Sequence, residues 1–283
     1  MAEYFTARNL PVPAELSRNP LTRWRRLLVI ASAIAVVYIG LRITDIDLSH
    51  SNPDFAARVI AKLFQWDTSI LTPQNEFETW WDTAEGLMVV TIFLGVVATA
   101  FAIAIAIPLS FLGARNIMTG NPVSAAVYLV VRLLFTIIRS IDVLILVIIT
   151  AILLGIGNAA GVIALAFHNI GVLGKLYSEA IEGIDPGPIE AITATGANRF
   201  QVIWTAVLPQ IVNPYISFTI YRLDANVRLA PILGLVGGGG IGLLLFQSIN
   251  LLHYGAAGLI IFMIVVTVAA MDFTSAQIRK RLT

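Results

Sequence analysis

The 283-residue sequence has no cysteine and little charge. Charged residues make up 12% of it and hydrophobic residues 58%, whereas about a quarter of the residues of a soluble domain are charged. Without cysteine, disulfides and thiolate metal sites are excluded. The three histidines, His50, His168 and His253, are scattered and show no metal-ligand spacing such as HExxH. A soluble fold is therefore excluded, and no cofactor or metal site is expected in this chain.

Phosphate-binding loops are also lacking. Gly171 to Lys175, GVLGK, ends in Gly-Lys but lacks the spacing that a nucleotide-binding loop requires before it, and no strand precedes it. The glycine run 237–240 is not followed by Gly-Lys-Ser/Thr, and no nucleophile–base pair is evident. We therefore expect a non-enzymatic protein whose energy comes from another subunit or from an ion gradient.

Long runs without charge are what the sequence has instead. The stretches 86–114, 143–174 and 229–271 contain no charged residue, and about 20 apolar residues suffice to cross a bilayer. The sequence predicts an all-α, polytopic transmembrane domain over residues 27–283 after a polar tail, 1–26. About six spans are expected, near 27–44, 85–112, 123–154, 159–180, 210–234 and 255–274. The third is too long for one straight span and must tilt, break or protrude.

The distribution of charge predicts the orientation. Basic residues precede the first span, lie in the loops 113–122 and 181–207, and end the chain, while acidic residues concentrate between 45 and 85. The positive-inside tendency then places both termini and the loop 181–207 in the cytoplasm and the segment 45–84 outside. Residues 27–41 also resemble a signal peptide, but the basic residues begin late and no small-residue cleavage pattern follows Gly40. An uncleaved anchor is the favoured interpretation.

The loop 181–207 is polar and helix-forming. Gly187, Pro188 and Glu190 predict a helix start with Gly187 as the N-cap, and Gly196 predicts its end after about two turns. Asn198 and Gln201 have the spacing of a reciprocal cap for a second short helix that runs to Val207. Pro209 then introduces the next span.

Good capping chemistry alone would explain these helix ends. It does not explain some 25 polar residues between spans, where about 2–8 suffice. The loop is therefore interpreted as a docking surface for a soluble partner. The small residues Ala191, Ala194 and Gly196 would let that partner approach closely.

Charged residues inside or beside the apolar segments form a second candidate site. They are Arg132, Arg139, Asp142, Arg222, Asp224 and Arg228. A central arginine costs on the order of 3 kcal/mol toward lipid, so these side chains must face protein, water or one another. Helical spacing predicts the pairs Asp224–Arg228 and Arg139–Asp142, which would make these charges structural. Arg222 and Arg132 have no partner nearby in the sequence.

A functional interpretation of these arginines is an oxyanion path. A guanidinium group stays charged and holds oxyanions through paired hydrogen bonds. Arg222, Arg228 and Arg139 are the stronger candidates. Arg132 is a weaker one, because it would meet only lipid headgroups if it lies at the cytoplasmic edge, and the sequence does not distinguish that position from one inside the bilayer.

The spacing of Glu190-Ala191-Ile192, Gly196 and Leu208-Pro209 resembles the EAA loop of ABC-importer permeases. Three stretches resemble the phosphonate-type permeases of this family: AIPLSFLGARN (106–116), ALAFHNIGVLGKLYSEAIEGIDPGPIEAITATGANRFQVIWTAVLPQ (164–210) and YRLDANVRLAPILGLVGGGGIG (221–242). The resemblance implies a type I permease fold and a membrane subunit that works beside a second, identical or homologous permease. It also implies two ATPase subunits that bind ATP and Mg, and an external binding protein that delivers phosphonate, phosphate or phosphite.

The two candidate sites then take these members. The ATPase-coupling residues are Glu190, Ala191, Ala194, Gly196, Asn198, Leu208 and Pro209. The substrate-pathway residues are Arg139, Arg222, Asp224, Asn226 and Arg228, with Tyr221 beside them, and the gating glycines are Gly237, Gly238, Gly239 and Gly240. Membrane lipid is the remaining expected partner, and no nucleic acid is expected.

Some positions depart from the family pattern. Ile192 stands where the loop usually has alanine, Ala206 where it has isoleucine, and Asp224 where glutamate is usual. Asp142 stands where a proline is usual, so the resemblance alone does not predict a kink in the third span. The segment 45–82 is unusually long and is a candidate contact for the binding protein or for a second permease.

Three rival functions remain at this point. The first is an importer for another solute, such as an amino acid or a sulfonate. The second is a proton- or sodium-coupled carrier, which would need a charge relay beyond Asp224. The third is a membrane enzyme that acts on lipid phosphates, for which the sequence offers no catalytic group.

Overall fold

The computed structural model describes residues 20–44, 52–73, 75, 78–118 and 120–282. It divides into two units, Met1–Ala56 and Ala57–Thr283. The first contains α2 (Pro20–Ile43), whose stretch Trp24–Ile43 is long and apolar enough to cross a membrane. The expected tail 1–26 falls mostly outside the described residues.

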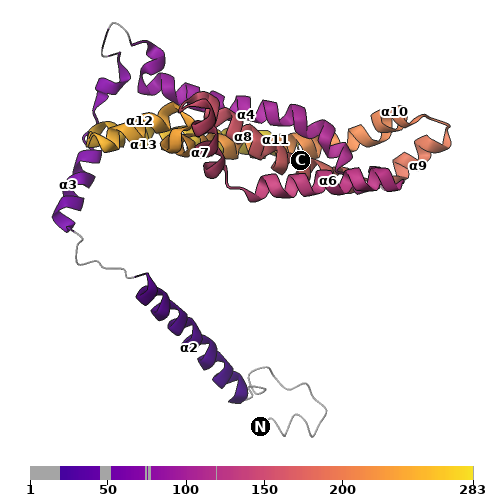
Figure 1. Cartoon of the computed structure of the whole chain (residues 1–283), viewed down its shortest axis with the longest axis horizontal. Helices are drawn as coiled ribbons and strands as arrows, with labels where there is room; N and C mark the ends of the chain where they lie inside the picture. Colours follow the sequence, from indigo (N-terminus) through magenta and orange to yellow (C-terminus); the bar gives the residue numbers. More distant parts are fainter. Residues whose placement is uncertain (1–19, 45–51, 74, 76–77, 119, 283) are drawn as a thin grey trace. The chain divides into compact units, whose positions relative to one another are not determined.

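The second unit is a bundle of helices (Figure 1). In the described part of the chain, five helices pass the length and hydropathy test for a span: α2, α4 (Ala84–Leu112), α6 (Pro122–Ser140), α8 (Asn158–Glu182) and α13 (Tyr254–Leu282). A sixth span is formed if α11 (Leu208–Leu233) and α12 (Gly240–Asn250) count together, with a bend of 58° at the glycine run. The prediction of an all-α domain with about six spans is confirmed.

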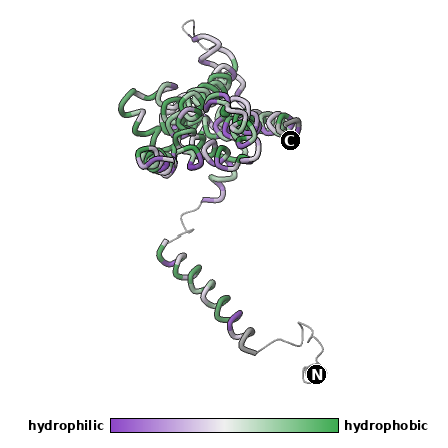
Figure 2. The backbone as a smooth tube through the Cα atoms, turned by 90° about the vertical axis from the view of Figure 1, so that its right-hand side faces the viewer, coloured by the Kyte–Doolittle hydropathy of each residue, from purple (hydrophilic) through white to green (hydrophobic). Residues whose placement is uncertain are grey.

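α8 lies in the middle of the bundle and contacts α4, α6, α7 (Val143–Leu154) and α11. Close packing depends on glycine: a Cβ at Gly174 would lie 2.4 Å from the Phe135 ring, and one at Gly161 would lie 2.4 Å from the Gly238 carbonyl oxygen. Large apolar side chains face outward instead, as in Ile152 and Phe101. Figure 2 shows hydrophobic residues along most of the bundle, as expected where lipid replaces water.

The third predicted span is broken, although it has no proline at the break. α6 ends at Ser140 and α7 begins at Val143, with Ile141 and Asp142 extended between them. The Asp142 carboxylate accepts a hydrogen bond from the Leu144 backbone N–H at 2.8 Å and so caps α7. An N-cap therefore marks the break, at the position where the resemblance implies a proline. The predicted Arg139–Asp142 pair is wrong, because the break removes the helical register that would bring the two together and the carboxylate serves the cap.

After α11 comes η4 (Gly234–Gly238), whose backbone leaves helical geometry at Val236 and Gly237, and the chain then bends by 58° into α12. Gly237, Gly239 and Gly240 have φ of +102°, +77° and +65°. Residues with a Cβ atom rarely adopt such positive values. The Asn158 side-chain oxygen accepts from the Gly240 N–H at 3.0 Å, and Thr91 Oγ1 accepts from the Ile241 N–H at 2.8 Å. Neighbouring helices therefore shelter this irregular backbone.

Residues 57–82 fold onto the bundle. α3 (Pro53–Leu63) ends in this segment, which also contains two short 3-10 helices, η1 (Thr68–Leu71) and η2 (Trp80–Asp82). A Cβ at Gly258 would lie 1.8 Å from the Leu63 carbonyl oxygen, so the backbone of this segment touches α13. The Trp66 and Phe262 rings, 4.7 Å apart, extend this contact.

Candidate functional site: the coupling loop and the polar bundle interior

The loop 181–207 projects from one end of the bundle as α9 (Pro186–Ala194) and α10 (Arg199–Val202) (Figure 1). We call this end the loop end. The N-cap of α9 is Asp185, whose carboxylate accepts from the Gly187 N–H at 2.9 Å. The prediction of Gly187 as N-cap is therefore wrong by two residues. Aspartate supplies the oxygen that glycine lacks, and Pro186 is suited to the first helical position.

The predicted end of the first helix and the predicted start of the second are confirmed. α9 ends at Ala194, and Gly196 follows with φ of +82°. Asn198 and Gln201 form the reciprocal cap: each side-chain oxygen accepts from the other residue's backbone N–H, at 2.9 and 2.8 Å.

The second helix does not stop at Val207, however. α10 continues through a π-helical turn, η3 (Ile203–Val207), into α11. Pro209 lies in the first turn of α11, where its missing N–H costs little. A force on α10 therefore acts directly on α11.

Gln210 fixes the base of the loop, a role that sequence reasoning missed. Its side-chain oxygen accepts from the Asp185 N–H at 2.9 Å, and its side-chain nitrogen donates to the Ala206 carbonyl at 2.8 Å. The start of α9 is thus tied to the start of α11, 25 residues further along the chain.

The outer surface of the loop is exposed. Glu190, Ala191, Ala194, Gly196 and Asn198 are all exposed. Two large aromatic side chains accompany them, Phe200 at 85% and Trp204 at 73% exposure. Leu208 is half-buried against the bundle and Pro209 is exposed at its edge. A groove of about 1060 Å³ separates the loop from residues 116–124.

Arg222 lies in the bundle interior and points at α8. Its Nε and one Nη donate to the side-chain oxygen of Asn169 at 3.0 and 2.6 Å. Asn169 is fully buried, and its side-chain nitrogen has no hydrogen-bond partner among the described residues. Asn169 was not predicted; the signal was available, since it is a polar residue in the charge-free run 143–174.

Asn226 lies one turn beyond Arg222 on the same face of α11. It is fully buried, its side-chain nitrogen donates to Thr99 Oγ1 at 2.7 Å, and its oxygen has no partner in the described structure. The Arg222–Asn226 face therefore carries both donors and an acceptor.

Asp224 and Arg228 occupy the opposite face of α11, because residues two apart on a helix point in nearly opposite directions. The predicted pair is confirmed, with 3.4 Å between Arg228 Nη2 and Asp224 Oδ2. Arg228 also forms an ion pair with Asp272 of α13, which sequence reasoning missed. Arg139 is exposed on α6, and Tyr221 is exposed on α11. The predicted pathway residues thus fall on separate surfaces of this chain.

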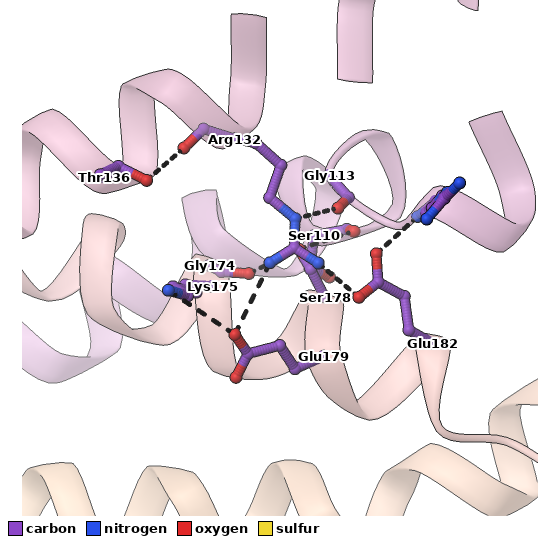
Figure 3. A network of polar contacts seen from close by, with 10 residues as sticks. Ser110, Gly113, Arg132, Thr136, Gly174, Lys175, Ser178, Glu179 and Glu182 are labelled. Atoms are coloured by element: carbon purple, nitrogen blue, oxygen red, sulfur yellow. Dashed lines mark hydrogen bonds and ion pairs between the residues drawn. The ribbon is translucent and has the colours of Figure 1, made fainter. Parts of the chain in front are cut away.

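Arg132, predicted to lack a local partner, has distant ones. It forms ion pairs with Glu182 and Glu179 of α8, at 2.5 and 3.7 Å (Figure 3). Within the described residues, no cluster of three or more histidine or acidic side chains is arranged to hold a metal ion.

Residues 106–283 match the model of the family described as binding-protein-dependent transport system inner membrane component. The chain belongs to this family. It is therefore a multi-pass, non-catalytic inner-membrane permease component of a binding-protein-dependent transport system.

Relatives of known name agree with this assignment. The chain is 43% identical over 192 residues to the phosphate-import permease protein PhnE of Mycolicibacterium smegmatis, covering 68% of this chain and 35% of that one. It thus spans only about a third of that relative's length. It is 36% identical over 190 residues to the phosphite transport system permease protein PtxC of Stutzerimonas stutzeri, covering 67% and 68%.

Solved structures show the same fold. An inward-facing structure of the MetNI methionine ABC transporter matches the permease with a TM-score of 0.59 at 23% identity, over 69% of this chain and 94% of that one. This likeness confirms the type I permease architecture.

Proposed function

We propose that this permease forms half of the membrane pathway of an ATP-driven importer for phosphonate, phosphate or phosphite. A second permease chain, identical or homologous, forms the other half. Two ATPase subunits bind ATP and Mg, and an external binding protein delivers the oxyanion. The names of the relatives support this substrate class, because they include a phosphate and a phosphite permease and a putative cryptic phosphonate permease of Escherichia coli that is 46% identical over 118 residues.

The proposed orientation places both termini and the loop 181–207 in the cytoplasm, the segment 45–84 outside, and the tail 1–26 inside. The charge distribution supports it. So does the arrangement of the bundle, in which α9 and α10 lie at one end and η1 and η2 at the other (Figure 1).

Charge balance in the bundle distinguishes Arg222 from its neighbours, and this observation carries the substrate assignment. Arg228 has two carboxylate partners, Asp224 and Asp272, and Arg132 has two, Glu179 and Glu182. For Arg222, the described partner is the neutral Asn169. A charge withdrawn from water is costly unless an opposite charge compensates it. A transported oxyanion would supply that charge.

The hydrogen-bonding groups around Arg222 also suit this ligand. The guanidinium has five N–H donors in a fixed fork that fits paired oxygens of phosphate or phosphonate. Asn169 offers a further donor, and the unpartnered Asn226 oxygen offers an acceptor for a P–OH proton. Gly237, Gly238, Gly239 and Gly240 lie beyond the end of α11, at the bend into α12, where we propose that they form the gate.

The proposed mechanism is alternating access. ATP-driven closure of the ATPase subunits moves the coupling residues of 181–207, Glu190 and Gly196 among them. The continuous helix from α10 to α11 carries this movement to Arg222. Access to Arg222 then alternates between the two sides of the membrane.

The substrate is tested with the complete importer in lipid vesicles, with binding protein and labelled phosphate outside and ATP inside. We expect ATP-dependent uptake that phosphonate or phosphite reduces and that D-methionine and sulfonate do not. Uptake that proceeds without ATP, or that only D-methionine reduces, would contradict the proposal.

The coupling surface is tested by cross-linking, for which the absence of native cysteine is convenient. Phe200→Cys places a thiol on the exposed loop surface. With a thiol-to-amine reagent we expect a product with the ATPase. The control Ile152→Cys, on an exposed apolar position of α7, should give none. The same result for both variants would refute the assignment of the loop.

A further inference from the structure

Arg132 joins three segments at the loop end of the bundle (Figure 3). Its Nε donates to the Gly113 carbonyl at 2.9 Å, and one Nη donates to Glu182 Oε2 at 2.5 Å. The other carboxylate oxygen of Glu182 accepts from the Arg115 backbone N–H at 2.8 Å. The end of α4, the short helix α5 (Arg115–Met118), α6 and the end of α8 therefore meet at one cluster.

The position of Glu182 gives this cluster mechanical importance. Glu182 is the last residue of α8 and lies three residues before Asp185, the cap of α9. Any displacement of the loop 181–207 therefore reaches Glu182 through a very short connection. Gln210 ties the start of α9 to the start of α11. A displacement of the loop can therefore be transmitted by two routes, one through α11 and one through Arg132.

α6 is suited to receive a displacement along the second of these routes. It is a 19-residue helix and hence roughly 28 Å long. Arg132 is the eleventh residue of α6 and fixes the helix near its middle to Glu182, and Phe135, further along α6, packs against Gly174 of α8. A rigid helix held on α8 in this way moves as a unit when the end of α8 is displaced, and it ends at the Ile141–Asp142 break before α7.

We propose that the Arg132–Glu182 pair is a positioning contact that couples the loop 181–207 to α6, so that ATP-driven movement of the loop shifts α6 together with α11. The inference rests on the proposed function and adds a second transmission route to it. Neither residue touches substrate. Both are needed for full coupling of hydrolysis to transport.

The first test compares Arg132→Gln, Glu182→Gln and the double variant in the reconstituted importer. The readout is oxyanion taken up per ATP hydrolysed, which a merely structural contact would not change in correctly assembled complexes. We expect each single variant to lower this ratio about tenfold, within the usual range of coupling between sites. The double variant should lose no more than the single variants, because the residues act as one unit.

Lys175→Gln is the matched control. Lys175 lies on the same helix as Glu182, carries a positive charge like Arg132 and also contacts Glu179, at 3.8 Å, but its contact stays within α8. Its ratio should remain that of the wild type. A wild-type ratio in Arg132→Gln, or losses that multiply in the double variant, would overturn the proposal.

A covalent bridge covers the case in which the glutamine variants fail to assemble. In the Arg132→Cys, Glu182→Cys protein, a bifunctional thiol reagent about as long as the lost side chains rejoins α6 to α8. We expect low uptake per ATP before bridging and recovery after it. No recovery, or full coupling before bridging, would refute the pair as the connection.

Failure of the proposed function is distinguishable from failure of this contact. The former appears in the wild-type importer as absence of ATP-driven oxyanion uptake. The latter appears as a variant whose uptake per ATP equals that of a working wild type.

Discussion

The loop end of the bundle and its interior differ in whether the polar side chains have hydrogen-bond partners. At the loop end, Arg132, Glu182 and Gln210 direct their side chains to carbonyls, carboxylates or amides of other segments. In the interior, Asn169 and Asn226 each keep one polar atom without a described hydrogen-bond partner. An unsatisfied buried polar group costs about 1–3 kcal/mol. The interior therefore retains a cost that a ligand or another transport state can relieve, whereas the loop end is built as permanent structure.

The largest effect is expected from a substitution of Arg222 in the bundle interior, because the described partner of this arginine is neutral. Arg222→Gln removes the charge and the donor fork that face Asn169. Two charge-assisted hydrogen bonds from Arg222 to the oxyanion are worth about 3 kcal/mol of binding free energy. Without them, uptake of phosphate at limiting concentration should fall roughly 100-fold. ATP hydrolysis by the assembled complex should persist.

The matched variant is Arg228→Gln, which removes the same charge from the opposite face of α11. Because Arg228 is already paired with Asp224 and Asp272, its loss should reduce the amount of assembled permease more than the affinity for the oxyanion. Equal losses of affinity in the two variants would erase the distinction between these faces.

The next effect concerns the buried Asn226–Thr99 hydrogen bond. Thr99→Val keeps the shape of the side chain but removes the acceptor for the Asn226 amide. We expect a loss of about 1–3 kcal/mol in resistance to unfolding, measured by denaturant titration of the purified permease in detergent. Adding Asn226→Leu should restore part of it, because both polar partners are then gone.

Thr136→Val serves as the control, since Thr136 is exposed and its hydroxyl donates to a carbonyl within α6. It should change the free energy of unfolding by less than about 0.5 kcal/mol. If Thr99→Val were equally mild, the buried amide would not be the costly group that we infer.

The same contrast explains what the sequence could predict. Spans follow from charge-free runs, and the cap at Asn198 and the turn at Gly196 depend on neighbours within a few residues. The Asp224–Arg228 pair was predictable because it lies within one helix. The partners of Arg132 and Asn226 were not, because they lie 50 and 127 residues away and meet only when helices pack. The break at Asp142 shows the intermediate case: its cap is local, but the usual proline signal is missing.

A smaller effect is expected at the turn of the coupling loop. Gly196 has φ of +82°, and nothing lies within 4 Å of the position that a Cβ would take there, so Gly196→Ala meets backbone strain and no steric clash. The strain is worth about 1–2 kcal/mol and should open the loop to limited proteolysis and lower uptake per ATP a few-fold.

Gly183→Ala is the comparison for that variant. Its Cβ would meet only ordinary contacts, the nearest being the Glu179 carbonyl at 3.5 Å, and its φ is −87°. It should therefore leave proteolysis and coupling unchanged. Equal sensitivity of the two alanine variants would show that the turn does not depend on the left-handed conformation of Gly196.

The smallest effect is expected in the segment before α4, where the exposed Asp67 carboxylate caps η1. Hydrogen bonds from the side chain and backbone of Ser69 lower the pKa of Asp67 below its ordinary value of 3.8. Because the folded-state pKa is depressed, the carboxylate stabilises η1 fully above about pH 4, and this contribution is lost as the pH falls through the folded pKa.

Asp67→Asn keeps an oxygen that can accept from the Ser69 N–H but cannot titrate. Protease protection of residues 57–71 should therefore weaken slightly below pH 4 in the wild type, by a few tenths of a kcal/mol at this exposed site, relative to the variant. Parallel pH profiles for the two proteins would mean that the charge of Asp67, as distinct from its cap, contributes nothing to the docking of this segment on α13.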